Sequence, residues 1–156
     1  ILSVCLIVAA PYITGRGSRY HFPGKELANQ AELAWHKWEK CPLPWATGEW
    51  WLAGNVCVYG QDRASVYCTP GANHFLNGRP FSTWGTIDNV RSDGGIILWR
   101  INSNDEKEQV PPALYEYFPE AAVLAPIEIP WQTQAPIPPL KIGMAIIRPE
   151  DRQLVK

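Results

Sequence analysis

The residues of this chain best suited to chemistry lie in one segment, Gly48–Asn55, which reads GEWWLAGN. The carboxylate of Glu49 could accept hydrogen bonds from sugar hydroxyls, and the ring of Trp50 or Trp51 could stack on a pyranose face. Asn55 offers both a donor and an acceptor. The alternative is that both tryptophans belong to the core and that Asn55 ties down a loop, since large aromatic side chains are mostly buried.

Two further charged residues, Asp62 and Arg63, stand side by side in a predicted turn. We include both as candidate ligand-binding residues. The alternative is a solvated turn or a local ion pair, which is the usual role of adjacent opposite charges.

Other chemistry-bearing patterns are missing from the sequence. It has no G-x-S-x-G elbow, no phosphate-binding glycine loop and no dinucleotide fingerprint, and its carboxylates lack the spacing of a catalytic pair. His21, His36 and His74 share no motif that would indicate a metal site. The sequence therefore predicts no catalytic residue, no metal and no cofactor within this chain.

The cysteines do not form the C-x-x-C pairs typical of zinc sites and redox motifs. Cys57 and Cys68 flank a predicted turn, so a disulfide between them is one interpretation in an oxidising compartment. Two buried free thiols are the other.

The candidate residues must be positioned by predicted helices and strands. Periodicity, prolines and glycines predict helices over 25–40, over 50–59, from Ser82 or Thr83 to Arg91, and over 111–117. They also predict strands over 43–47, 65–68, 96–101, 123–129 and 141–147.

These elements predict an α/β fold. Strands joined by helices run parallel, whereas the short proline-rich link 130–139 suits an antiparallel pair. We therefore expect a three-layer-like sandwich with a small, mostly parallel sheet, an antiparallel C-terminal edge and helices on its faces. Gly48–Asn55 then lies where a strand passes into a helix, at the sheet edge that receives ligands in open α/β folds.

The first 13 residues, ILSVCLIVAAPYI, are apolar and uncharged. We interpret 1–13 as the end of a transmembrane helix or an apolar lead, because a complete span needs about 20 apolar residues. The alternative is a buried first strand over Ser3–Ala9. The prediction continues with a single soluble α/β domain over 14–149 and a polar tail over 150–156.

Composition argues against nucleic acid as a partner. The 156 residues include 14 Lys and Arg against 15 Asp and Glu, for a formal net charge of -1, and no basic run is present. A phosphate backbone requires a basic stripe to neutralise it.

Several stretches resemble the C-terminal soluble portion of bacterial GT-C membrane glycosyltransferases of the protein mannosyltransferase and aminoarabinose transferase type. They are GEWWLAGNVCVY with DRASVY, then GGIILW, YFPEAAVLAPIEIPW and LKIGMAIIRP. The family pattern has Asp at the position of Glu49 and lacks the cysteines at positions 57 and 68.

The resemblance implies an extracytoplasmic accessory domain of an integral membrane enzyme that takes a sugar from a polyprenyl phosphate. It places the chain on the periplasmic side of the bacterial inner membrane, joined to the membrane by the N-terminal apolar segment, with a lipid-linked sugar or glycan acceptor as ligand. It also implies that the catalytic residues lie outside this chain. Arg16 and Arg19 oppose the periplasmic assignment, because basic flanks favour the cytoplasmic side.

Two other functions remain open at this point. One is a non-catalytic envelope module that binds a protein or a glycan through exposed aromatic side chains. The other is an independent hydrolase, which the missing nucleophile and carboxylate pair disfavour.

Overall fold

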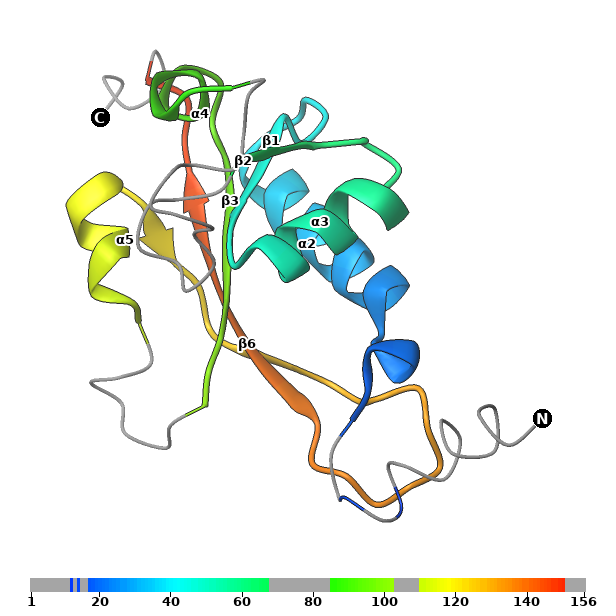
Figure 1. The fold of residues 1–156 in the computed structure, drawn as a ribbon. Coiled ribbons are helices and arrows are strands. Elements are labelled where there is room, and N and C mark those ends of the chain that lie inside the picture. Colours follow the sequence, from blue (N-terminus) through cyan, green and yellow to red (C-terminus); the bar gives the residue numbers. More distant parts are fainter. Residues whose placement is uncertain (1–11, 13, 15–16, 68–84, 103–109, 151–156) are drawn as a thin grey trace.

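The computed structural model of this chain describes residues 12, 14, 17–67, 85–102 and 110–150. Helices and strands alternate along much of this part of the chain (Figure 1). The helices are η1 (Arg19–His21, a single 3-10 turn), α2 (Gly24–Trp38), α3 (Trp50–Tyr59), α4 (Ile87–Asp93) and α5 (Pro112–Tyr117), and the strands are β1 (Trp45–Gly48), β2 (Ser65–Tyr67), β3 (Gly95–Arg100), β4 (Ala122–Val123), β5 (Ile127–Ile129) and β6 (Leu140–Ile147).

The described strands form one open, mixed sheet in the order β2-β1-β3-β6-β4, and β5 also pairs with β6. Strand β1 runs parallel to β2 and β3, whereas β3, β4 and β5 run antiparallel to β6. The predicted α/β fold is therefore confirmed, with its parallel core, its antiparallel C-terminal edge and its helices packed on the sheet.

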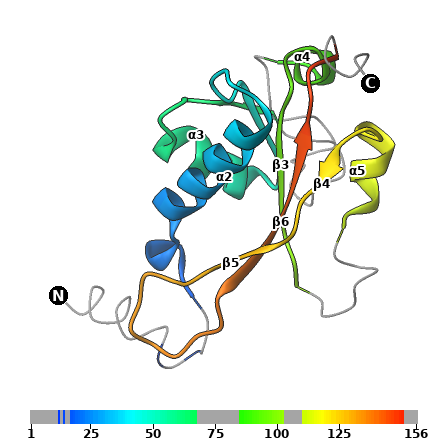
Figure 2. The same ribbon diagram turned by 180° about the vertical axis from the view of Figure 1, so that it is seen from behind.

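The sheet separates two hydrophobic clusters. Helices α2 and α3 pack on one face, and α5 lies on the opposite side of the sheet (Figures 1 and 2). Successive residues of β3 point to opposite faces. Its sequence GIILW is continuously apolar because both faces are covered. The first cluster includes Leu27, Trp35, Leu52, Val56, Ile96 and Leu98, and the second includes Val90, Ile97, Trp99, Leu114 and Phe118.

Helix α4 begins later than the sequence predicts. Its N-cap is Thr86, whose side chain accepts a hydrogen bond from the Asn89 main chain while the Asn89 side chain accepts from the Thr86 main chain. This capping box fixes the start of the helix at Ile87, so the predicted start at Ser82 or Thr83 is wrong. Those two residues lie outside the described part of the chain. The predicted stop is confirmed, since Gly94 ends the helix with a φ of 82°.

The predicted strand over 123–129 is in fact two short strands separated by a bulge. The register changes because Leu124, Ala125 and Pro126 together face only Gly143 and Met144 on β6. One extra residue in a strand bends it and interrupts the ladder. The alternation of apolar residues in the sequence gives no sign of this insertion.

Prolines restrict the outer edge of β5. The main-chain N–H of Ile101 donates to the carbonyl of Lys141, so the neighbouring residues of β6 direct their main-chain groups toward β5. By the same alternation, the main-chain groups of Glu128 point away from β6. Pro126 and Pro130 stand two residues to either side of Glu128 and have no N–H to offer. This edge therefore presents few donors to an additional strand.

Candidate ligand-binding site at the carboxyl edge of β1 and β3

A glycine brings the candidate segment against the neighbouring strand. Gly48 ends β1 with a φ of 96°, and a Cβ atom placed there would lie 2.2 Å from the carbonyl oxygen of Leu98 in β3. The next N–H, that of Glu49, donates to the same oxygen at 2.8 Å. Only glycine tolerates both this backbone conformation and this approach. Glu49 is therefore held at the carboxyl ends of two adjacent parallel strands, as predicted.

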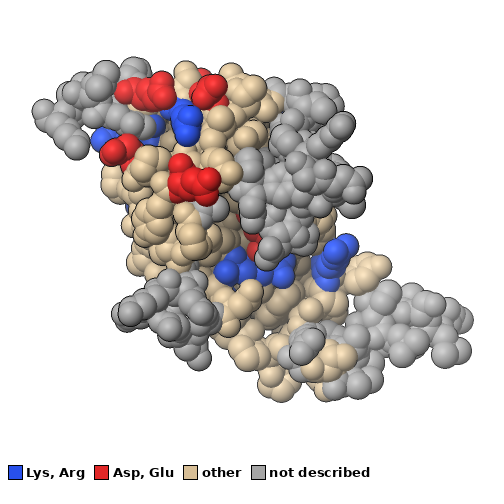
Figure 3. Space-filling view, turned by 60° about the vertical axis from the view of Figure 1, so that its left-hand side comes forward, with Lys and Arg blue, Asp and Glu red and all other residues tan. Residues whose placement is uncertain are grey.

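The charged group beside Glu49 is Arg100, the last residue of β3. Its Nε atom lies 3.1 Å from Oε1 of Glu49, and both side chains are partly buried. The Nε–H makes no hydrogen bond of good geometry within the described residues, so charge attraction holds the pair. A guanidinium has five N–H donors and a carboxylate about four acceptor sites, so both groups keep capacity for a ligand. Figure 3 shows basic side chains close together in the lower half of one face, with an acidic one among them.

The two tryptophans after Glu49 have different surroundings. Trp51 is half-buried and meets the ring of Phe22 edge to face at a centroid distance of 5.8 Å. The guanidinium of Arg19 covers the Trp51 ring at 5.1 Å. Trp50 touches Trp51 edge to face at 5.7 Å but remains 40% exposed. Of the two rings proposed for stacking on a sugar, Trp50 is therefore the accessible one.

The Asn55 side chain makes contacts within α3 and with α2. Its Nδ2 donates to the carbonyl of Trp51 at 2.7 Å, one turn back along α3. Its Oδ1 lies so close to Gly24 that a Cβ atom there would be 2.3 Å away. Asn55 thus packs between α2 and α3, as in the alternative interpretation that it is a structural residue.

Asp62 and Arg63 lie at the opposite end of the parallel strands from Glu49. They directly precede β2, so they are at the amino end, separated from the Glu49 edge by the length of β1, on the order of 10 Å. The Asp62 carboxylate accepts a hydrogen bond from the main-chain N–H of Leu43 at 2.8 Å, and Nε2 of His36 lies 2.9 Å from it. Arg63 is exposed, with a φ of 54°. The structure does not bring this pair to the Glu49 edge.

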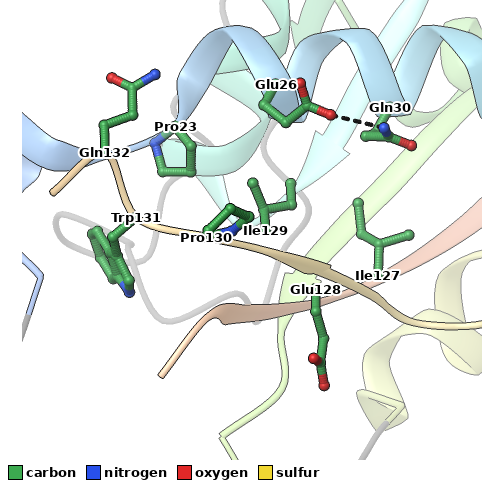
Figure 4. A pocket seen from close by; sticks show the side chains of 9 residues that line it. All are labelled: Pro23, Glu26, Gln30, Ile127, Glu128, Ile129, Pro130, Trp131 and Gln132. Atoms are coloured by element: carbon green, nitrogen blue, oxygen red, sulfur yellow. Dashed lines mark hydrogen bonds between the residues drawn. The ribbon is translucent and has the colours of Figure 1, made fainter. Parts of the chain in front are cut away.

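A groove adjoins the aromatic residues. It has a volume of about 580 Å³ and runs between the first half of α2 and β5 (Figure 4). Ile127 and Ile129 point toward the helix, and Glu26 and Gln30 line the helix side, joined by a hydrogen bond of 2.8 Å. Trp131, at the end of the groove, packs edge to face on Phe22 at a centroid distance of 6.2 Å. Because Phe22 also packs on Trp51, this contact connects the groove with Trp51.

Sequence reasoning missed several residues of this region. Arg100 could have been found, because it closes a predicted strand parallel to the one before Glu49. Phe22, Trp131 and the two sides of the groove come together only through tertiary packing across about a hundred residues, and no local pattern indicates that.

The remaining site predictions have these outcomes. Cys57 is half-buried on α3 and forms no disulfide within the described residues, and Cys68 lies outside them, so the pairing of these two cysteines stays a prediction. Within the described ranges, no three His, Cys, Asp or Glu side chains gather as a metal site. Across those same ranges no helix combines the length and apolarity needed to cross a bilayer. Most of the apolar lead over 1–13 falls outside them.

Comparisons of this chain with protein-family models, with curated proteins and with solved structures find no match. The glycosyltransferase resemblance thus stays a hypothesis based on the sequence motifs.

Proposed function

We propose that this chain is the soluble, extracytoplasmic accessory domain of an integral membrane glycosyltransferase with a polyprenyl-phosphate-linked sugar donor. It holds that sugar, or the glycan acceptor, at the carboxyl edge of β1 and β3. The reacting groups belong to the membrane part of the enzyme, on the periplasmic face of the bacterial inner membrane. The motif resemblance supports the class of enzyme, and the geometry of the edge supports the binding role.

One observation carries the binding role: an accessible tryptophan directly follows, in the sequence, the carboxylate of a partly buried ion pair. Trp50 is 40% exposed, and the preceding residue, Glu49, contacts Arg100. A sugar needs an aromatic face for its C–H groups and charged or amide groups for its hydroxyls. A glycosyl phosphate also needs a cation, and guanidinium groups match phosphate oxygens well.

In this arrangement the pyranose stacks on Trp50 and donates its hydroxyls to the Glu49 carboxylate. The phosphate is directed to Arg100. The ion pair orients both side chains before the ligand arrives, which lowers the entropy lost on binding. Asn55 and Asp62 take no part, because their contacts lie elsewhere, and Arg63 takes none because it lies at the amino end of β2.

The test is a titration of the chain with mannose 1-phosphate and with a neutral mannose oligosaccharide, followed by NMR. Trp50→Ala should weaken both interactions by roughly three- to tenfold, the magnitude of a lost aromatic contact. Trp38→Ala is the matched control, because Trp38 is 43% exposed but stands at the far end of α2. Arg100→Gln should remove the preference for the phosphorylated sugar and leave the neutral one nearly unchanged.

Equal affinities for the wild type and the Trp50 variant would contradict the proposal, as would equal losses in the Trp38 control. Thermal melting of each variant shows whether a loss of binding reflects unfolding.

A second candidate function, an envelope module that binds a protein, is favoured by the outer face of the helix pair. Val58 and Tyr59 on α3 and Leu33 on α2 are all exposed, and α3 carries no charged residue. A helix that is apolar on all sides is usually covered. Absence of any carbohydrate response in the titrations, together with a stoichiometric envelope partner, would favour this function.

A further inference from the structure

One end of the molecule, here named the basal end, consists of residues 17–22 and the loop 130–139. The two segments lie side by side at the lower end of both ribbon views, opposite α4 (Figures 1 and 2). They are joined by a hydrogen bond of 2.9 Å from the Gln132 N–H to the His21 carbonyl. Gly17 also packs flat on the Trp131 ring, since a Cβ atom there would lie 2.2 Å from ring atoms. The basal end is therefore a packed unit.

The loop of the basal end is free of charge. Residues 130–139 read PWQTQAPIPP, with exposed prolines at positions 136, 138 and 139 and a half-buried Ile137 between them. Gln132 and Gln134 are also exposed, so the loop presents uncharged polar and apolar groups and none of the charged side chains that are almost always at the surface. On the face drawn in Figure 3, the described surface below the basic side chains carries no charge.

Beside this loop stand an exposed cation and an exposed aromatic side chain. Tyr20 is 75% exposed, and the exposed Arg19 stacks its guanidinium over Trp51 at 5.1 Å. Tyrosine, tryptophan and a basic group next to apolar surface form the composition found at the boundary between water and lipid. The cation suits lipid phosphates, and the rings suit the headgroup level.

The sequence that precedes the basal end also suits a lipid environment. Residues 1–11, ILSVCLIVAAP, are apolar and uncharged, and the chain that follows them enters the folded part at Gly17, against Trp131. A lipid-seeking segment thus joins the domain at the same end as Arg19, Tyr20 and the uncharged loop.

We propose that the basal end docks on the surface of a phospholipid bilayer with anionic headgroups. Arg19 contacts lipid phosphates, and Tyr20 and the exposed prolines of the loop enter the interfacial layer. The inference rests on the membrane location in the proposed function and goes beyond it, because the folded domain itself, and not only the N-terminal segment, touches lipid. In the docked orientation, α4 points away from the membrane. The Glu49 edge lies beside the basal end.

The test compares binding of the full chain to vesicles of phosphatidylcholine alone and with phosphatidylglycerol added. Arg19→Glu combined with Tyr20→Ser should weaken binding to the anionic vesicles by roughly tenfold or more, since each charge near such a surface contributes about a factor of five. Trp38→Ser is the control, because it removes an exposed aromatic side chain, 43% accessible, outside the basal end.

Hydrogen exchange gives a second readout, because it reports on individual amides of the basal end. Vesicle binding through the N-terminal apolar segment alone does not protect those amides. With anionic vesicles, amides of residues 18–22 and 131–137 should exchange at least about threefold more slowly, and those of α4 should not change. Equal vesicle binding by the double variant would overturn the proposal, and so would an unchanged exchange rate at the basal end of bound protein.

These outcomes are separate from those of the sugar titrations, which contain no vesicles. The Arg19 and Tyr20 double variant should still bind mannose 1-phosphate, and Trp50→Ala should still bind vesicles. If the wild type docks on vesicles but binds no sugar, the proposed function is contradicted. If it binds sugar but amides of the basal end do not exchange more slowly with vesicles, the docking is contradicted.

Discussion

Replacing Asp62 by alanine tests whether this carboxylate is structural or part of a binding site. Its side chain is only 15% exposed, accepts a hydrogen bond from the Leu43 main chain at 2.8 Å and lies 2.9 Å from Nε2 of His36. Leu43 is almost completely buried, so its N–H would lose its partner in a place that water hardly reaches. Leaving a buried donor without a partner costs about 1–3 kcal/mol.

The contact with His36 adds little, because that ring is 40% exposed and solvent screens the interaction to below about 1 kcal/mol. The bond from the Asp62 main chain to Glu32 survives the substitution. We therefore expect Asp62→Ala to lower the free energy of unfolding by about 2–3 kcal/mol, roughly 4–12 °C in melting temperature for a domain of this size.

Urea unfolding followed by circular dichroism measures this loss directly. Asp62→Asn, which keeps one acceptor oxygen, should recover about half of it. Asp88→Ala is the control, because Asp88 is 83% exposed and its partner within the described ranges is Arg91 at 3.4 Å, so its removal should change stability by less than about 0.5 kcal/mol. A stable Asp62→Ala protein that no longer binds sugar would refute the reasoning and return Asp62 to the binding site.

Two further substitutions test the elements that position the site. Gly48→Ala should destabilise the domain by at least about 2 kcal/mol, since a left-handed backbone conformation is unfavourable for alanine and the added methyl meets the Leu98 carbonyl. Urea unfolding measures this loss. Gly54→Ala is the control, because nothing lies within 4 Å of the added methyl inside α3, and it should raise stability by up to about 1 kcal/mol. Thr86→Ala removes the N-cap of α4 and should cost about 1 kcal/mol in the same measurement, whereas Thr86→Ser should retain most of the stability; equal losses in both variants would contradict the capping assignment.

Much of the fold could be predicted because its determinants are local. The helix period over 25–40 and the glycine after 93 depend on neighbours in sequence, and parallel pairing follows from the helices that link the strands. One error arises where distant residues decide, because the bulge over 124–126 is imposed by the register on β6. The other is local, since the start of α4 is fixed by the mutual bonds of Thr86 and Asn89, three residues apart.

The candidate site could be predicted only in part. A strand that passes into a helix locates Glu49 and Trp50, because this junction is a local feature. Which tryptophan is exposed depends on Phe22 and Arg19, which cover Trp51 and come from another element. Asp62 was misleading for a similar reason: its partners are Leu43 and His36, and adjacency to Arg63 says nothing about them.

The contact between Gly17 and Trp131 leaves no room for a side chain where the chain enters the folded part, because a Cβ atom there would lie 2.2 Å from the ring. Trp131 lies between β5 and β6 and also packs on Phe22, just before α2. Any larger residue at position 17 would therefore displace the indole and disturb two distant stretches of the backbone at once.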